Sequence, residues 1–264
     1  MHIALCHPEL IASAPRSNAA SATQPTIKTM LLVAMCWSFF PFEHFPAVIA
    51  QEAPPNDGIS VEILLRGGTV IDGTGGASRK GDVAIKNGKI LLPTPDQRVE
   101  SAWELDCSGL IICPGFIDLH NHSDGEIEEN ATRSAMNYVM QGCTTLVTGN
   151  CGSGPINVGQ YYDHIDKYGS GTNVAHLLPQ GGLRKAVLDS NRVEPTEPQL
   201  EEMLQLAERA MLDGAWGMST GLIYVPSSYA TTEELTTIAR VVAKHNGIYV
   251  SHIRGEGTTL WDSV

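Results

Sequence analysis

Residues 114–124 read PGFIDLHNHSD, a short apolar run that ends in two histidines separated by one residue. Side chains at positions i and i+2 of a strand point to the same face, so His120 and His122 are predicted to lie side by side where this strand ends. Two neutral imidazoles on one face suit a divalent cation such as zinc, although the spacing by itself is common. The stretch therefore predicts a metal site at the carboxyl end of a strand.

The chain from residue 114 onward alternates between strands and helices. One amphipathic helix is predicted from about Thr196 to Gly214, and a second over residues 231–246, where Thr231 and Glu234 match a capping box. Apolar strands are predicted at residues 115–119, 144–148, 173–178, 215–219 and 248–251. This alternation predicts an α/β fold with a parallel sheet, of the (β/α)8 TIM-barrel type. Such a barrel takes about 250 residues, so residues 114–264 are expected to hold about five of its eight strand–helix units.

Residues 51–113 follow a different pattern, with short strands predicted at residues 59–70, 82–91 and 103–112 and no helical period. The pair Asn87-Gly88 between two apolar runs is typical of a type I′ hairpin turn. We therefore predict a small β domain over residues 51–113, followed by the incomplete barrel over residues 114–264.

Residues 1–50 are predicted to be a signal or targeting segment. An apolar run at residues 30–40 follows Lys28 and is too short for a bilayer span of about 20 residues. Small residues end the segment, as signal peptidase requires, with cleavage expected after Ala50. The alternative, a buried helix of the fold, is disfavoured by Pro41 and Pro46. The protein is therefore expected to be exported, periplasmic or secreted, without a stable membrane anchor.

The composition limits the classes of partner. Hydrophobic residues make up 42% of the chain and charged residues 17%, which is typical of a soluble globular protein. Acidic residues outnumber basic residues by 29 to 17, giving a formal net charge of −12. Because nucleic-acid binders normally present a basic face, no nucleic-acid partner is expected.

Two further candidates for the metal site follow later strands. Cys151 lies in GNCG at residues 149–152, and His252 lies in SHIR at residues 251–254. The carboxyl ends of barrel strands meet at one rim, so both side chains are predicted to lie near His120 and His122. Cys151 could instead be a small buried apolar residue.

The other histidines after residue 114 serve as a contrast to these candidates. His164 and His245 fall on helices and are predicted to lie at the surface. His176 falls within a strand and is predicted to lie in the core or beside the site.

As a set, four motifs resemble the N-acyl-D-amino-acid deacylases, the D-aminoacylase branch of the amidohydrolase superfamily. The resemblance spans residues 60–257 and rests on RGGTVIDGTGG at 66–76, PGFIDLHNHSD at 114–124, TTLVTGNCG at 144–152 and GLIYVP at 221–226. It implies a metal-dependent barrel with a small β domain made from both ends of the chain. Most binuclear relatives carry a carboxylated lysine after the fourth strand, whereas that strand here ends MSTG at residues 218–221. The deacylase branch uses a cysteine after the second strand instead, and Cys151 matches it.

The resemblance also assigns roles to individual residues. It implies that His120 and His122 hold one metal position, and that Cys151 and His252 help to hold a tightly bound zinc, with the thiolate able to bridge to a second, weaker site. Tyr224 matches the tyrosine that faces the substrate. The resemblance places a further metal-binding histidine after strand six and the general-base aspartate after strand eight, beyond Val264.

The activity implied by the resemblance is zinc-dependent hydrolysis of the amide bond of N-acyl-D-amino acids, which are small-molecule substrates. Because no catalytic residue is assigned within residues 1–264, this chain alone is expected to be inactive. Two alternatives are a hydantoinase-like amidohydrolase of cyclic amides, which a lysine after strand four would favour, and a non-catalytic metal-binding fragment. The acyl group, the side-chain preference, the metal count and the oligomeric state are left open.

Overall fold

The computed structural model describes residues 3–6 and 58–263, which divide into two compact units. The first unit comprises residues up to Phe116 together with Asn137–Thr144, and the second comprises Ile117–Met136 and the residues from Thr145 onward. The domain boundary was predicted between residues 113 and 114, and the first segment of this unit ends at Phe116.

The first unit is built on a mixed β-sheet whose strands follow the order β1-β6-β2-β3-β4, with β5 paired to β2. Asn87 and Gly88 join β3 to β4 with positive φ angles of 51° and 70°, as a type I′ turn requires. The strands of this unit are β1 (Ile3–Cys6), β2 (Ile59–Val70), β3 (Arg79–Lys86), β4 (Lys89–Leu91), β5 (Val99–Asp106) and β6 (Ile111–Pro114).

The single strand predicted at residues 103–112 is wrong, because the chain turns between β5 and β6. The Asp106 carboxylate accepts a hydrogen bond from the Ser108 N–H at 2.9 Å, and Gly109 adopts a φ of 78°. An aspartate that bonds to the backbone two residues later, followed by a glycine with positive φ, favours a turn over extension.

The prediction that residues 1–50 stand apart from the fold is wrong for one short stretch. Ile3–Cys6 forms β1 and pairs antiparallel with β6, with Ile3 opposite Pro114 and Cys6 opposite Ile111. The pairing gives partners to backbone groups that β6 would otherwise expose at the edge of the sheet. The remainder of the predicted signal segment lies outside the described residues.

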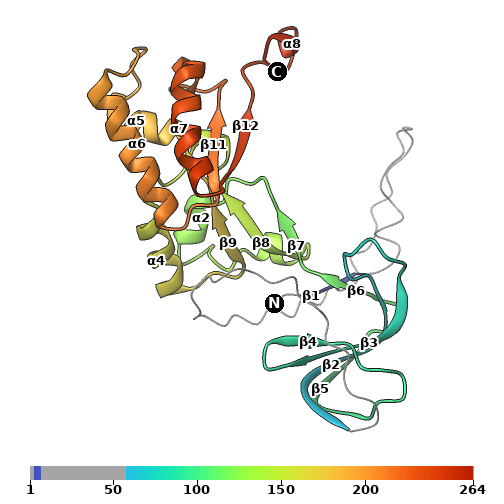
Figure 1. Ribbon diagram of the computed structural model, residues 1–264. Coiled ribbons are helices and arrows are strands. Elements are labelled where there is room, and N and C mark those ends of the chain that lie inside the picture. The colour runs from blue at the N-terminus through green and yellow to red at the C-terminus, as the bar shows by residue number, and fades with distance from the viewer. Residues whose placement is uncertain (1–2, 7–57, 264) are drawn as a thin grey trace. The chain divides into compact units, whose positions relative to one another are not determined.

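The second unit carries strands whose neighbours follow chain order, β7-β8-β9 in one sheet and β10-β11-β12 in the next. The pairs β8–β9, β10–β11 and β11–β12 are parallel. The helices α5 (Gln180–Leu188) and α7 (Thr232–Lys244) lie beside β11, and α6 (Glu197–Leu212) packs against both helices (Figure 1). The strands are β7 (Phe116–Asp118), β8 (Cys143–Thr148), β9 (Asn173–His176), β10 (Leu178–Pro179), β11 (Gly217–Gly221) and β12 (Ile248–His252).

The strand predicted at residues 173–178 divides at Leu177 into β9 and β10. The Leu177 N–H donates to the Thr148 carbonyl at 3.0 Å, and the Trp216 N–H donates to the His176 carbonyl at 2.9 Å. The break marks a change of hydrogen-bonding partner, from β8 on one side to the segment before β11 on the other. Parallel strands in consecutive order agree with an α/β sheet of the predicted kind.

Helices connect the strands, and both predicted amphipathic helices are present, as α6 and α7. Every helix within the described ranges falls short of the length and apolarity that a membrane span requires. The helices are α2 (Asp124–Glu128), α3 (Met136–Val139), α4 (Val158–Tyr168), α5 (Gln180–Leu188), α6 (Glu197–Leu212), α7 (Thr232–Lys244) and α8 (Leu260–Ser263), with short 3-10 turns η1 (Asn150–Gly152) and η2 (Ser227–Tyr229).

The capping box predicted for α7 is only half formed. The Thr231 hydroxyl accepts the Glu234 N–H at 3.2 Å, but the Glu234 carboxylate does not return to the cap. It is buried instead, where it accepts hydrogen bonds from Arg184 and from Gln180, the latter at 3.0 Å. A buried guanidinium offers a carboxylate a charge-assisted bond that is stronger than a bond to the neutral cap N–H. Arg184 and Glu234 therefore fasten α5 to α7.

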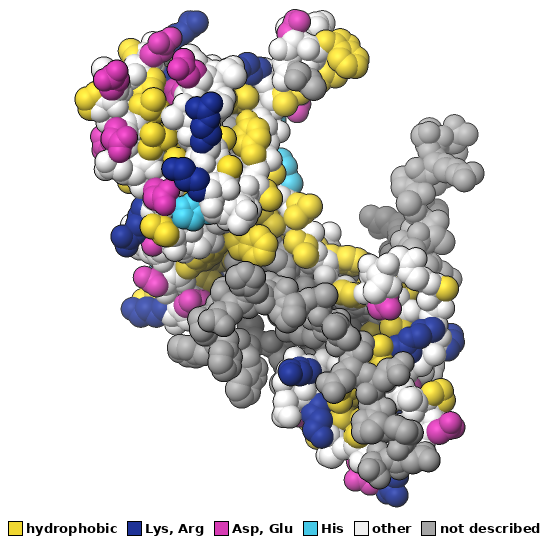
Figure 2. Space-filling view, viewed as in Figure 1, with side chains coloured by type: hydrophobic (Ala, Val, Ile, Leu, Met, Phe, Trp, Pro, Cys, Tyr) yellow, Lys and Arg dark blue, Asp and Glu magenta, His cyan; other side chains and the backbone are white. Residues whose placement is uncertain are grey.

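The core of the second unit lies between these helices and β11. Met203 and Ala207 of α6, Ile238 of α7 and Met218 of β11 belong to one cluster and are fully buried. On the face seen in Figure 2, acidic and basic side chains are interspersed over the helices of this unit. The helices therefore bury an apolar stripe and present mixed charge to solvent.

We expect Glu234→Ala to destabilise the protein by about 3–5 kcal/mol, because it leaves the buried Arg184 guanidinium without its counter-charge. The matched control is Glu100→Ala, which breaks the 2.9 Å pair with Arg98, in which the two side chains are 67% and 80% exposed. That control should cost less than about 1 kcal/mol. Urea unfolding followed by circular dichroism measures both. Equal costs would show that the buried pair contributes no more than a surface pair.

Candidate metal centre

His120 and His122 follow the end of β7, where the sequence predicted them, and the strand stops one residue before the predicted residue 119. The strand ends at Asp118, whose carboxylate accepts the His120 N–H at 3.0 Å and so turns the chain. The two imidazole rings nevertheless lie together, edge to face, with centroids 5.5 Å apart. Both side chains are exposed at the end of the strand.

Cys151 is presented by a tight turn at the end of β8. Gly149 and Cys151 both adopt left-handed conformations, with φ angles of 77° and 53°. A cysteine rarely takes this conformation, because its Cβ crowds the backbone there. The turn holds the half-buried thiol close to the His120 imidazole.

The described structure brings three of the predicted ligands together and places the fourth beside them. The donor atoms of His120, His122 and Cys151 all lie within 4.8 Å of one another. The Cys151 Sγ lies 3.4 Å from His120 Nε2 and 3.6 Å from His252 Nδ1. Bond lengths of about 2.3 Å to sulfur and about 2.0–2.1 Å to nitrogen place two ligands of a tetrahedral zinc about 3.5 Å apart. The distances from the sulfur to His120 and to His252 therefore match those between two ligands of one zinc ion.

Burial raises the pKa of the Cys151 thiol above its ordinary value, and the negative charge of Glu256 raises it further. The thiol is thus protonated at neutral pH unless a cation displaces the proton. A thiolate and imidazoles form a donor set that suits zinc better than magnesium or calcium, which prefer oxygen.

His252 and Tyr224 form the other side of the site. The Tyr224 hydroxyl lies 3.4 Å from His252 Nδ1, and the two rings stand edge to face at 4.9 Å. On the opposite edge of the imidazole, Nε2 lies 3.4 Å from a Glu256 carboxylate oxygen. A carboxylate beside the far nitrogen of a histidine favours the ring orientation that leaves the near nitrogen to a metal.

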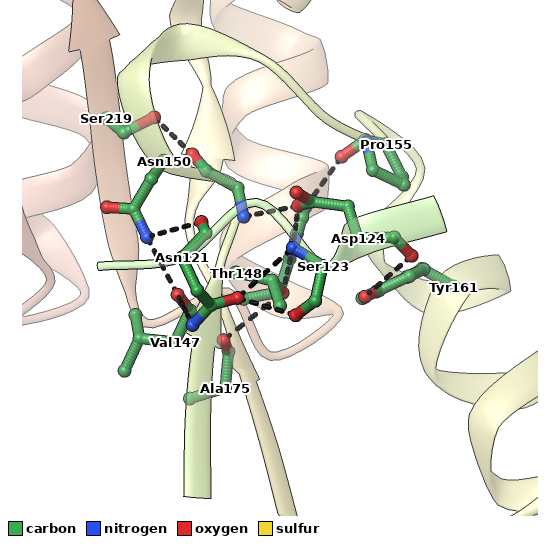
Figure 3. A network of polar contacts seen from close by, with 12 residues as sticks. Asn121, Ser123, Asp124, Val147, Thr148, Asn150, Pro155, Tyr161, Ala175 and Ser219 are labelled. Carbon is green, nitrogen blue, oxygen red and sulfur yellow. Dashed lines mark hydrogen bonds and ion pairs between the residues drawn. The ribbon is translucent and has the colours of Figure 1, made fainter. Parts of the chain in front are cut away.

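Two side chains hold the Cys151 turn in place (Figure 3). The Asn150 amide donates to the Val147 carbonyl at 2.7 Å and reaches the Asn121 carbonyl at 3.4 Å, beside the histidine pair. The Ser219 hydroxyl accepts the Gly152 N–H at 2.9 Å and donates to the Gly149 carbonyl. The turn is therefore hydrogen-bonded to the middle of β11 and to Asn121, which lies between His120 and His122.

His176 is fully buried next to this network, in agreement with its predicted place in the core or beside the site. Its Nε2 donates to the Pro155 carbonyl at 2.8 Å, so its Nδ1 accepts from the Thr148 hydroxyl at 2.8 Å. The Asp124 carboxylate lies 3.8 Å from Nδ1 and also accepts the Gly149 N–H. Burial lowers the pKa of His176, against the opposing effects of the Pro155 carbonyl and the Asp124 charge. His176 is therefore neutral.

The two histidines that were predicted to lie on helices make their contacts away from the site. His164 is half-buried on α4, with its Nε2 3.0 Å from the Glu128 carbonyl. His245 is half-buried after α7 and pairs with Glu208 at 2.9 Å. Both were predicted to lie at the surface, and both are partly covered by these contacts.

A pocket of about 550 Å³ opens beside these residues. Its lining includes His122, Cys151, Tyr224 and Lys185 of α5. Four glycines also line it, at positions 152, 154, 181 and 182. This volume is in the range of small-molecule sites, about 300–1,000 Å³.

Sequence reasoning did not identify Asn150, Ser219, Glu256 or Lys185. Asn150 adjoins a predicted ligand and Glu256 lies four residues beyond His252, so the sequence alone could have pointed to both residues. Ser219 and Lys185 become visible only when β11 and α5 are placed beside the Cys151 turn.

Comparisons with known proteins agree with this geometry. No family model matches the chain. A D-aminoacylase of Alcaligenes xylosoxydans xylosoxydans is 32% identical over 225 residues, covering 76% of this chain and 46% of that protein. An N-acyl-D-aspartate deacylase from the same organism is 32% identical over 219 residues, covering 74% of this chain and 44% of the relative.

A solved structure of a related deacylase has a similar fold. The N-acyl-D-glutamate deacylase of Bordetella bronchiseptica, complexed with zinc and a phosphonate inhibitor that mimics the tetrahedral intermediate, aligns with a TM-score of 0.72 at 30% identity. The alignment covers 78% of this chain and 48% of that one. The chain is a homologue of the D-aminoacylases. It spans about half the length of the curated D-aminoacylase relatives that it matches.

We expect the stability of the protein to fall as the pH drops below about 6.5, the ordinary histidine pKa of the unfolded chain. Because the pKa of folded His176 is lowered, the unfolded state binds more protons in this range. The contribution is fully present above about pH 6.5 and is lost as the pH falls toward the folded pKa. Urea unfolding from pH 7.5 to pH 5 measures the slope.

His176→Gln should reduce this dependence of stability on pH. The control His164→Gln, which replaces a half-buried histidine on α4, should reduce it less. The same slope in the His176 variant and the unsubstituted protein would mean that other groups cause the acid sensitivity.

Proposed function

We propose that this chain carries the zinc-binding part of an amidohydrolase that cleaves the amide bond of N-acyl-D-amino acids, built on a barrel of the (β/α)8 type. The observation that carries the proposal is the position of the Cys151 sulfur, 3.4 Å from His120 Nε2 and 3.6 Å from His252 Nδ1. The homology to D-aminoacylases supports it from an independent direction. The absence of a lysine from residues 217–221 of β11 disfavours the hydantoinase-like alternative.

The roles we assign follow from where each group lies. His120, His122, Cys151 and His252 would hold the metal, with one tight zinc site and room for a second, weaker one. Zinc in such a site supplies a Lewis acid and lowers the pKa of bound water.

The protein's own groups position the ligands and the substrate. Glu256 lies 3.4 Å from His252 Nε2, on the edge of the ring away from Cys151, while Asn150 and Ser219 fix the Cys151 turn. Tyr224 lines the pocket, and its hydroxyl can donate a hydrogen bond to a substrate carbonyl or carboxylate. The named relatives act on different side chains by their descriptions, so the substrate side chain depends on the rest of the pocket. We further propose that the protein acts after export, and that residues 1–264 alone bind ligand without hydrolysing it.

Cys151→Ala should abolish tight zinc binding, because the remaining imidazoles lose the anionic ligand between them. The matched control is Cys107→Ala, a fully buried thiol of the first unit, which should keep its zinc. Zinc retained after dialysis against a weak chelator, measured by elemental mass spectrometry, reports the outcome. Unchanged zinc in the Cys151 variant would remove the cysteine from the site and with it the deacylase assignment.

Tyr224→Phe should weaken binding of a phosphonate analogue of an N-acyl-D-amino acid by about 1–3 kcal/mol, the cost of an unmet hydrogen bond. The melting temperature should barely change, because Tyr224 is 51% exposed and contributes little to the core. Calorimetric titration of the zinc-loaded protein with the D and L analogues measures the effect, and Tyr168→Phe on α4 is the control. A lower melting temperature with unchanged affinity would assign Tyr224 to packing.

A further inference from the structure

One face of α5 lines the pocket beside the proposed metal ligands. Gly181, Gly182 and Lys185 all contribute to the lining, and residues three and four positions apart lie on one face of a helix. Leu183 and Leu188 lie on the buried side of the same helix. Lys185 therefore extends from the pocket face of α5, one turn beyond the two glycines.

The neighbouring basic residue has a different environment. Arg184 is fully buried and bonds to the Glu234 carboxylate and the Val193 carbonyl. Lys185 is exposed, and its ammonium group has no hydrogen-bond or ion-pair partner among the described residues. Its charge is thus available to a ligand, whereas that of Arg184 is already neutralised within the core.

The charge of the lining differs from that of the chain. The formal net charge of the chain is −12, but the described residues that line this pocket include no aspartate or glutamate. Lys185 is the lysine among these lining residues, and its side chain ends in an ammonium group. Glu256, which lies against His252, is outside the lining. The pocket therefore combines a metal-binding end with a cation and no opposing carboxylate.

We infer that Lys185 binds a carboxylate of the ligand that occupies this pocket. The inference rests on the proposed function, since an N-acyl amino acid presents an amide to the metal-binding end and at least one carboxylate beyond it. The carboxylate is either the α-carboxylate or that of an acidic side chain, and both offer the ammonium group the same charge-assisted hydrogen bond. Glycines at positions 152, 154, 181 and 182 contribute no side chains to the lining.

The test is calorimetric titration of the zinc-loaded full chain with three ligands that share one skeleton. N-acetyl-D-glutamate carries both carboxylates, N-acetyl-D-glutamine only the α-carboxylate, and N-acetyl-D-isoglutamine only the side-chain carboxylate. Lys185→Gln should weaken N-acetyl-D-glutamate binding by about tenfold, as expected for loss of a charge-assisted hydrogen bond. Lys244→Gln, at an exposed position in the last turn of α7, should leave the affinity unchanged.

The two mono-carboxylates distinguish the source of the charge. A loss confined to N-acetyl-D-glutamate and N-acetyl-D-isoglutamine supports the inference and identifies an acidic side chain. A loss confined to N-acetyl-D-glutamate and N-acetyl-D-glutamine supports it and identifies the α-carboxylate. In either case the loss should shrink as salt is added, and Lys185→Arg should restore most of the affinity.

Equal affinities of wild type and Lys185→Gln for all three ligands would overturn the inference and leave the zinc centre and Tyr224 untouched. Wild type that retains zinc but binds none of the three ligands would also overturn it, together with the proposed substrate. Loss of zinc itself is measured separately, so failure of the metal centre cannot be mistaken for failure of Lys185.

Discussion

The turn that follows β8 must hold a cysteine in a left-handed conformation between two histidines, and the rest of the site depends on that constraint. Such a conformation is unfavourable for a residue with a Cβ, so neighbouring groups have to maintain it. The Ser219 hydroxyl meets the N–H of Gly152 and the carbonyl of Gly149, on either side of Cys151. Because Ser219 belongs to β11, the position of the sulfur depends on correct pairing of strands far apart in the sequence.

The same turn connects to the segment that carries the histidine pair. The Asn150 amide reaches the carbonyls of Leu119 and Asn121, which flank His120 on both sides. A shift of the turn would therefore move the His120 backbone as well as the sulfur. Supporting hydrogen bonds of this kind fix the geometry of a metal site before the ion binds. They also explain why the donor atoms converge although His120 and His122 lie beyond the regular part of β7.

Much of this arrangement could be predicted from the sequence, because strand ends in a parallel α/β sheet meet at one edge. The predicted strand ends place His120, Cys151 and His252 at that edge, and in the structure the Cys151 sulfur lies 3.4 Å from His120 and 3.6 Å from His252. Where a side chain could take either of two roles, the sequence did not show which role it takes. Glu234 stands where a capping box needs it, yet a buried arginine from α5 takes its carboxylate. Arg184 and Lys185 are adjacent and alike in charge, and only packing against α7 determines which one is buried.

The histidines show how hydrogen bonding separates a structural side chain from a candidate ligand. Both nitrogens of His176 have partners at 2.8 Å, so it has no lone pair left for a metal. His252 has a carboxylate at one nitrogen and, at Nδ1, only the Cys151 sulfur at 3.6 Å and the Tyr224 hydroxyl at 3.4 Å. These separations exceed those of strong hydrogen bonds, so Nδ1 gives up little when it turns to a cation. Proximity to a carboxylate is common to both residues, since Asp124 lies near His176 as Glu256 lies near His252. The available lone pair, rather than the nearby acid, is what makes His252 a ligand candidate.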